Sequence, residues 1–100
     1  MPKFETEQRP ETRSAFYERR RLRRIRMIVE LTLNLISSDN TVSHREARCL
    51  CDCARKAILE LYPAFSDRYE RVIRPAFERV LQERWPEEEL HFSHAGEIVN

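Results

Sequence analysis

Arginine is the residue type in this sequence that points most clearly to ligand binding, and it is concentrated in one short segment. Six arginines occupy the eight positions from 19 to 26. Guanidinium groups bind phosphate and carboxylate groups through paired hydrogen bonds. At helical spacing, five of the six lie away from the apolar positions. The candidate contacts to a polyanion or to an acidic partner are therefore Arg19, Arg20, Arg23, Arg24 and Arg26.

Two classes of partner suit these arginines. Phe16 and Tyr17 precede them by about one helical turn, and arginines with neighbouring aromatic rings are typical of surfaces that bind nucleic acid. No base-reading motif accompanies them, however, and Glu87, Glu88 and Glu89 form a matching acidic cluster in the same or a second chain. We therefore expect the arginines to face a protein or solvent, with nucleic-acid binding as the alternative.

A metal site is a weaker alternative reading of the cysteines. Cys49 and Cys53 are one helical turn apart, so both thiolates could bind one zinc ion, with His91 and His94 completing four ligands. Structural zinc sites more often take their cysteines from turns, and Cys51 falls on the apolar face of the same segment. We expect neither a metal ion nor another cofactor.

No pattern in the sequence predicts an enzyme. The only glycine is Gly96, so a glycine-rich phosphate loop is not available, and no nucleophile is paired with a base. We expect no catalytic residue and no small-molecule substrate. The odd number of cysteines favours a reducing compartment, and the apolar run 25–36 is too short to span a bilayer. These features predict a cytoplasmic protein without a membrane segment.

Composition and apolar spacing predict the elements that position these residues. A chain with 35% charged residues, 41% hydrophobic residues and one glycine is typical of an all-α domain. Apolar periodicity predicts helices over about 12–37, 43–62 and 66–85, packed as an antiparallel three-helix bundle with a long first helix. Residues 1–11 are expected to be a disordered lead and 12–86 the bundle domain. Residues 87–100 are expected to form an acidic, partly ordered tail without helical period.

Local signals refine the second and third helices. Ser43 and Glu46 have the spacing of a capping box, which predicts a helix that begins at this point. Pro75 lies inside the third helix, where apolar residues keep one phase on both sides, so we expect a continuous helix kinked at this residue. The expected core consists of Leu22, Ile25, Val29, Ile36, Leu50, Ala54, Ile58, Leu61, Tyr69, Val72, Ile73 and Val80.

The first helix carries more apolar surface than a small bundle can cover. Met27, Leu31 and Leu35 form a second stripe beside its core stripe, and Leu59 lies nearly opposite the core face of the second helix. An exposed apolar patch usually marks an interface. We therefore predict self-association as a homodimer, or binding to another protein, through these four residues. The function expected is that of a small, non-enzymatic interaction or regulatory module.

Overall fold

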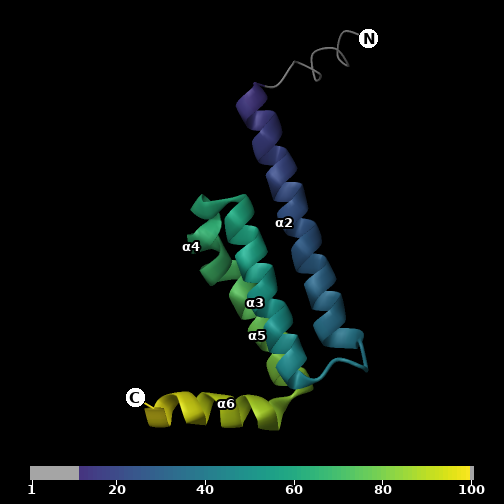
Figure 1. Ribbon diagram of the computed structural model, residues 1–100, viewed down its shortest axis with the longest axis vertical. Coiled ribbons are helices and arrows are strands. Elements are labelled where there is room, and N and C mark those ends of the chain that lie inside the picture. Colours follow the sequence, from purple (N-terminus) through teal and green to yellow (C-terminus); the bar gives the residue numbers. More distant parts are fainter. Residues whose placement is uncertain (1–11, 100) are drawn as a thin grey trace.

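The computed structural model describes residues 12–99, which are helical apart from short connections (Figure 1). This confirms the all-α class. The long helices are α2 (Arg13–Ser38), α3 (His44–Leu61), α5 (Arg74–Arg84) and α6 (Pro86–Val99). The expected lead, residues 1–11, lies outside the described residues.

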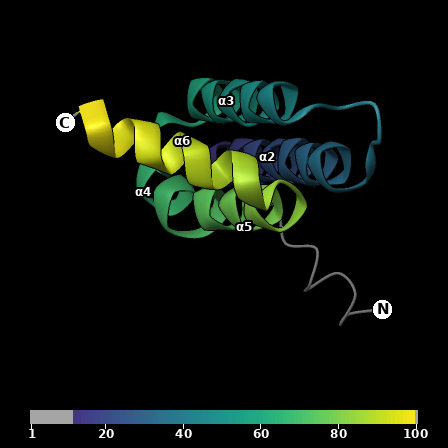
Figure 2. The ribbon, with the colours of Figure 1, turned by 90° about the horizontal axis from the view of Figure 1, so that it is seen from below.

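The core lies between α2, α3 and α5, each of which contacts the other two. A short connection, residues 39–43, turns the chain back so that α2 and α3 run antiparallel, and α2 lies between α3 and α5 when the molecule is seen end-on (Figure 2). The largest fully buried side chains are Ile36, Ile58, Phe77 and Leu81. At least one comes from each of the three helices, so the core stabilises all three together.

Hydrogen bonds from capping side chains fix where the two long helices begin. The Thr12 hydroxyl accepts the Ala15 backbone N–H at 3.0 Å at the start of α2. The Ser43 hydroxyl accepts the Glu46 N–H at 3.1 Å, and the Glu46 carboxylate accepts the Ser43 N–H at 2.9 Å. The predicted capping box is therefore confirmed. Each of these bonds satisfies a backbone N–H that has no partner within its helix.

The expected third helix is assembled from several kinds of helical turn. It begins with a 3₁₀ turn (Pro63–Phe65) and a short α-helical turn, α4 (Ser66–Arg68). A π-helical segment (Tyr69–Ile73) follows and runs directly into α5. Here the Arg74 N–H donates to the Tyr69 carbonyl, five residues back. This wider turn comes just before Pro75, whose ring has no N–H and would crowd the carbonyl of an ordinary α-turn.

The π-helical segment changes the face that α5 presents to the core. A π-turn adds one residue to the helix, so the buried positions after it move one residue along the chain. Phe77 and Leu81 are buried, whereas Val80, which the α-helical phase placed in the core, is only half-buried. Val72, expected in the core, is 60% exposed. The expectation of one unchanged phase across Pro75 was therefore wrong.

Elsewhere the predicted core is largely confirmed. The buried members are Ile25, Ile36, Ala54, Ile58, Tyr69 and Ile73. A second group is only half-buried, at the edge of the core: Leu22, Val29, Leu50, Leu61 and Val80. Periodicity identifies the face of a helix correctly, but the neighbouring helices decide how deeply each residue on that face is covered.

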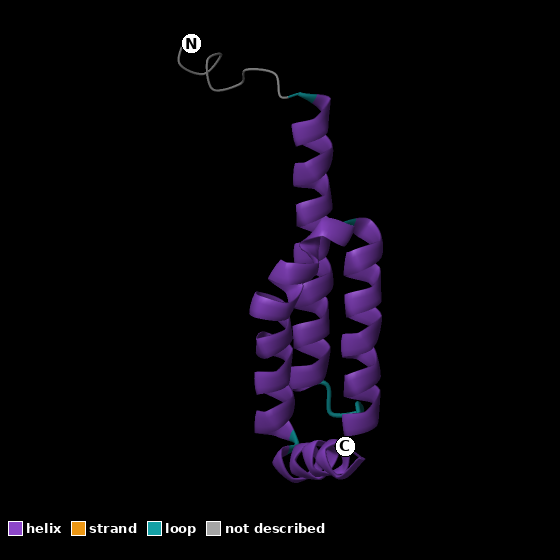
Figure 3. Cartoon of the chain, turned by 90° about the vertical axis from the view of Figure 1, so that its left-hand side faces the viewer, coloured by secondary structure: helices purple, strands orange, loops and turns teal. Residues whose placement is uncertain are grey.

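The fourth long helix, α6, stands where the sequence predicted a tail without helical period. Pro86 opens this helix, and Glu87, Glu88 and Glu89 occupy its first turn. Proline at the first position and acidic residues in the first turn are both start signals for a helix, although residues 87–100 were assigned to a tail. α6 crosses one end of the bundle (Figures 1 and 3). None of the described helices is long and apolar enough to cross a bilayer.

Candidate binding surfaces

The N-terminal part of α2 projects beyond the rest of the bundle. α2 has 26 residues and α3 has 18, which makes α2 longer by about 12 Å at a rise of about 1.5 Å per residue. The excess lies at the N-terminal end of α2, where no other helix runs beside it (Figure 3). Every side chain from Thr12 to Arg21 is exposed. This end of the helix is therefore open to solvent or to a ligand.

Tyr62, just after α3, joins the projecting part of α2 to the bundle. Its hydroxyl donates to the Glu18 carboxylate at 3.0 Å, which raises the pKa of Tyr62. The Arg21 guanidinium lies 5.0 Å from the centre of the Tyr62 ring, within range of a cation–π contact. Glu18 is the only acidic residue between Arg13 and Arg26. The one carboxylate among these arginines, that of Glu18, is therefore hydrogen-bonded to Tyr62.

The five arginines predicted to contact a partner all lie at the surface of the protein. Arg26 pairs with Glu30 at 3.1 Å, and Arg19 is exposed. Among the described residues, no carboxylate lies within 4.0 Å of Arg20, Arg23 or Arg24. α6 begins at the opposite end of the bundle (Figure 1). Its acidic first turn therefore does not neutralise the arginines of the same chain, as the sequence had suggested it could.

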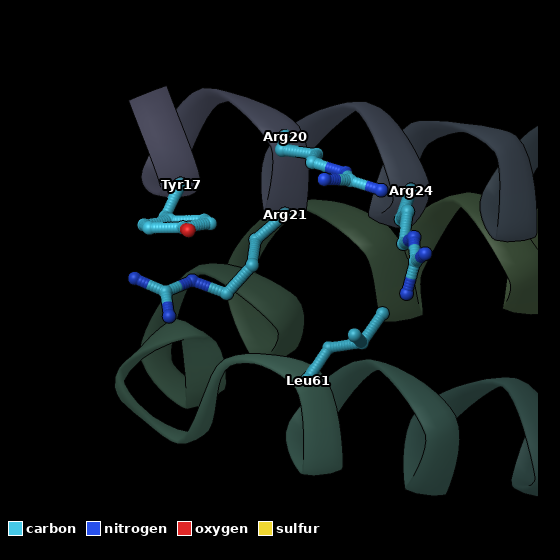
Figure 4. A pocket seen from close by; sticks show the side chains of 5 residues that line it. All are labelled: Tyr17, Arg20, Arg21, Arg24 and Leu61. Atoms are coloured by element: carbon cyan, nitrogen blue, oxygen red, sulfur yellow. The ribbon is translucent and has the colours of Figure 1, made fainter. Parts of the chain in front are cut away.

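A small cavity opens between the arginines and the end of α3. It has a volume of about 240 Å³ and is lined by Tyr17, Arg20, Arg21, Arg24 and Leu61. Arg20 extends along α2 toward Arg24, and Arg24 points from the next turn toward Leu61 of α3 (Figure 4). Two guanidinium groups in this arrangement suit an oxyanion such as a phosphate or a carboxylate.

An apolar surface follows the arginines along the same helix. Met27 is 68% exposed and Leu31 is 61% exposed. One turn further, Leu35 lines a groove of about 430 Å³ between α2 and α3, together with Leu50, Cys49 and Cys53. The structure thus brings together three of the four residues predicted for self-association. The fourth, Leu59, is partly buried against the core instead.

The cysteines do not form a metal centre with the described side chains. Cys49 and Cys53 are exposed at the edge of the groove, whereas Cys51 is buried. Burial raises the pKa of Cys51 to about 12, so its thiol stays protonated and unreactive. No three histidine, cysteine or acidic side chains converge in the described range. His91 is exposed on α6, and the side chain of His94 lies outside the described residues.

A buried charge cluster at the α6 end was not predicted from the sequence. The side chain of Glu89 is only 8% exposed and accepts hydrogen bonds from Arg48 (Nε to Oε2, 3.0 Å) and from the ring of His44. Burial alone would raise the pKa of Glu89, but these bonds outweigh burial and the pKa is lowered. The Arg48 guanidinium also lies 3.9 Å from the centre of the Phe92 ring. The cluster holds α6 against α3.

The only local signal for this cluster was the spacing of His44 and Arg48, four residues apart on one side of α3. Their partner is more than forty residues away in the sequence. Glu89 had been grouped with Glu87 and Glu88 as a free acidic surface, whereas only those two neighbours are exposed. No family model, curated protein or solved structure matches the chain. The function must therefore be argued from these surfaces.

Proposed function

We propose that this chain is a small, non-enzymatic interaction module that binds a protein surface through its exposed apolar face, in the simplest case a second copy of itself. The observation that carries the proposal is the exposure of Met27 and Leu31, at 68% and 61%. Both lie next to the apolar α2–α3 groove lined by Leu35 and Leu50. Contiguous apolar surface of this kind is uncommon on monomeric proteins and is typical of interfaces.

The proposed scaffold is the three-helix unit of α2, α3 and the segment 63–84. The mutual contacts of α2, α3 and α5 support this unit as the frame that holds the apolar face rigid. On this proposal α6 closes one end of the unit without contributing to the interface. The exposed face belongs to the C-terminal half of α2, which the core residues Ile25 and Ile36 anchor from behind.

A second copy is the simplest partner because the face lies along one straight helix. Two α2 helices packed antiparallel about a twofold axis would place Met27 of each copy against Leu31 of the other. Such an arrangement buries the same patch twice and needs no additional sequence. It also leaves the N-terminal ends of the two α2 helices pointing away from each other, outside the interface.

Light scattering with matched variants tests the proposal. We expect about twice the monomer mass at micromolar concentration for the wild-type chain. The double substitution Met27→Gln with Leu31→Gln should give a monomer with the helical content of the wild type, because neither side chain contributes to the core. Its melting temperature should fall only by the stability that dimerisation adds. Val72→Gln is the control, since Val72 is 60% exposed on a different element. A monomeric wild-type chain, or a dimer that survives the double substitution, would contradict self-association through this face.

A further inference from the structure

The projecting N-terminal end of α2 forms a second surface, which the proposed interface does not use. We define it as the cationic segment, residues 13–24. It holds six arginines and a single acidic residue, Glu18, which is bonded to Tyr62. Arg20, Arg23 and Arg24 are exposed, with no carboxylate within 4.0 Å among the described residues. Like charges this close together repel, so their accumulation is consistent with an anionic ligand.

The arginines cover more than half of the helix circumference instead of forming one stripe. At about 100° per residue, the six positions cover roughly 200° of the helix circumference. Glu18 falls on the remaining side and points to Tyr62 and the bundle. A flat acidic protein surface would meet only one side of such a helix. A ligand that supplies negative charge on two opposing walls can meet both flanks at once.

Duplex DNA has that shape. An α-helix with its side chains is about 10–12 Å across, and the major groove of B-form DNA is about 12 Å wide with a phosphate chain along each wall. No other helix runs beside the first turns of α2 (Figure 3), and further along only one side of the segment faces Tyr62 and Leu61, so the opposite side can enter such a groove. The major groove of A-form RNA is too narrow and deep for a helix to enter in the same way.

We propose that the cationic segment binds the major groove of duplex DNA, with arginines on its two flanks bound to the phosphates of both strands. The binding is largely independent of base sequence, because the proposal assigns the arginines to phosphates and positions 13–24 hold no asparagine or glutamine to read adenine. The proposal does not depend on self-association, since Met27 and Leu31 follow the segment and lie outside it. An acidic polypeptide as the true ligand is an outcome that the experiment separates.

Salt titration of binding to a labelled random-sequence duplex, followed by fluorescence anisotropy, tests the proposal. The logarithm of affinity should fall linearly with the logarithm of salt concentration, with a slope of about −0.9 for each phosphate bound. Arg23 and Arg24 point to sides of the helix about 100° apart. Arg23→Gln and Arg24→Gln should therefore each flatten the slope by about 0.9, and the double variant by about twice as much.

Control substitutions and competitors make the outcome decisive. Arg71→Gln with Arg79→Gln removes two exposed arginines from another face and should leave the slope unchanged. Duplex RNA should bind more weakly than DNA at equal salt. The proposal is overturned if only one flank substitution changes the slope, if the control variant flattens it equally, or if polyglutamate displaces the chain more effectively than unlabelled duplex DNA does. Absence of DNA binding at ~0.05 M salt, where nonspecific binding is strong, would also overturn it.

Discussion

The two ends of the bundle use the same kind of charged residue in opposite ways. At the α6 end, Arg48 is bonded to the buried Glu89, and Arg84 donates hydrogen bonds to the backbone carbonyls of Ile36 and Asp39. At the other end, Arg20 and Arg24 are exposed on a helix that projects from the fold. The first pair of arginines holds elements of the fold together. The second pair has no carboxylate within 4.0 Å among the described residues.

The contrast between the two ends separates two roles of arginine, one in stabilising the fold and one in binding a ligand. A charge that is partly buried and fully bonded belongs to the fold, and removing its partner leaves an uncompensated charge inside the protein. An exposed charge without a partner contributes little to folding. The arginines of the cationic segment therefore add little to the stability of the fold, and an external ligand is the more natural reason for their number. Substitutions at each end, and in the core that both ends share, can test this contrast.

The largest effect is expected in the shared core. Phe77→Ala should lower the free energy of unfolding by about 3–5 kcal/mol, because Phe77 is only 2% exposed and its truncation leaves a cavity in the core. Val72→Ala should change it by less than about 0.5 kcal/mol, since Val72 is at the surface. Denaturant unfolding of both variants measures the difference. Equal losses would contradict the shift of phase that the π-helical segment introduces.

At the α6 end, Glu89→Gln should lower the free energy of unfolding by about 2–3 kcal/mol, because Arg48 loses its buried, charged partner. Amide exchange in α6 should accelerate in the same variant. Glu88→Gln is a matched control on the neighbouring, exposed residue, with an expected change below about 0.5 kcal/mol. If the two substitutions have the same effect, the cluster does not hold α6 in place.

The same cluster predicts a pH dependence. The pKa of Glu89 in the folded chain is below 4.5, because the hydrogen bonds from His44 and Arg48 outweigh the effect of burial. A carboxyl group with a lowered pKa stabilises the fold above its unfolded pKa and loses this effect as the pH falls through the folded value. The melting temperature of the wild-type chain should therefore fall below about pH 4.5. Glu89→Gln should show a shallower decline. The half-buried Asp39 and Glu70, whose pKa values are also lowered, account for part of what remains.

The smallest effect is expected at the arginine end. Arg23→Gln with Arg24→Gln should leave the free energy of unfolding within about 0.5 kcal/mol of the wild-type value, because neither guanidinium has a charged partner within the described residues. A slight stabilisation is consistent with relief of repulsion between neighbouring cations. Denaturant unfolding at low salt, where such repulsion is strongest, is the measurement. A loss above 1 kcal/mol would assign these arginines a structural role and remove the contrast between the two ends.

The sequence by itself determined the features that depend on residues a few positions apart. The capping box of Ser43 and Glu46 and the core faces of α2 and α3, marked by Ile36 and Ile58, were predicted correctly. A cap spans three residues, and a helical face repeats every three or four, so the interactions that specify them are local. The arginines were likewise identified as a surface cluster before their surroundings were known.

Only the tertiary structure decided the features that depend on distant residues. The bonds from α3 to Glu89 join positions more than forty residues apart, and no local pattern specifies such a contact. The π-turn before Pro75 is visible only in the backbone, yet it selects Phe77 for the core. The position at which α3 ends beside α2 decides how much of the arginine-bearing part of α2 is left uncovered. Local patterns specify α2 and α3, whereas the packing between helices decides which of their side chains are free to bind a ligand.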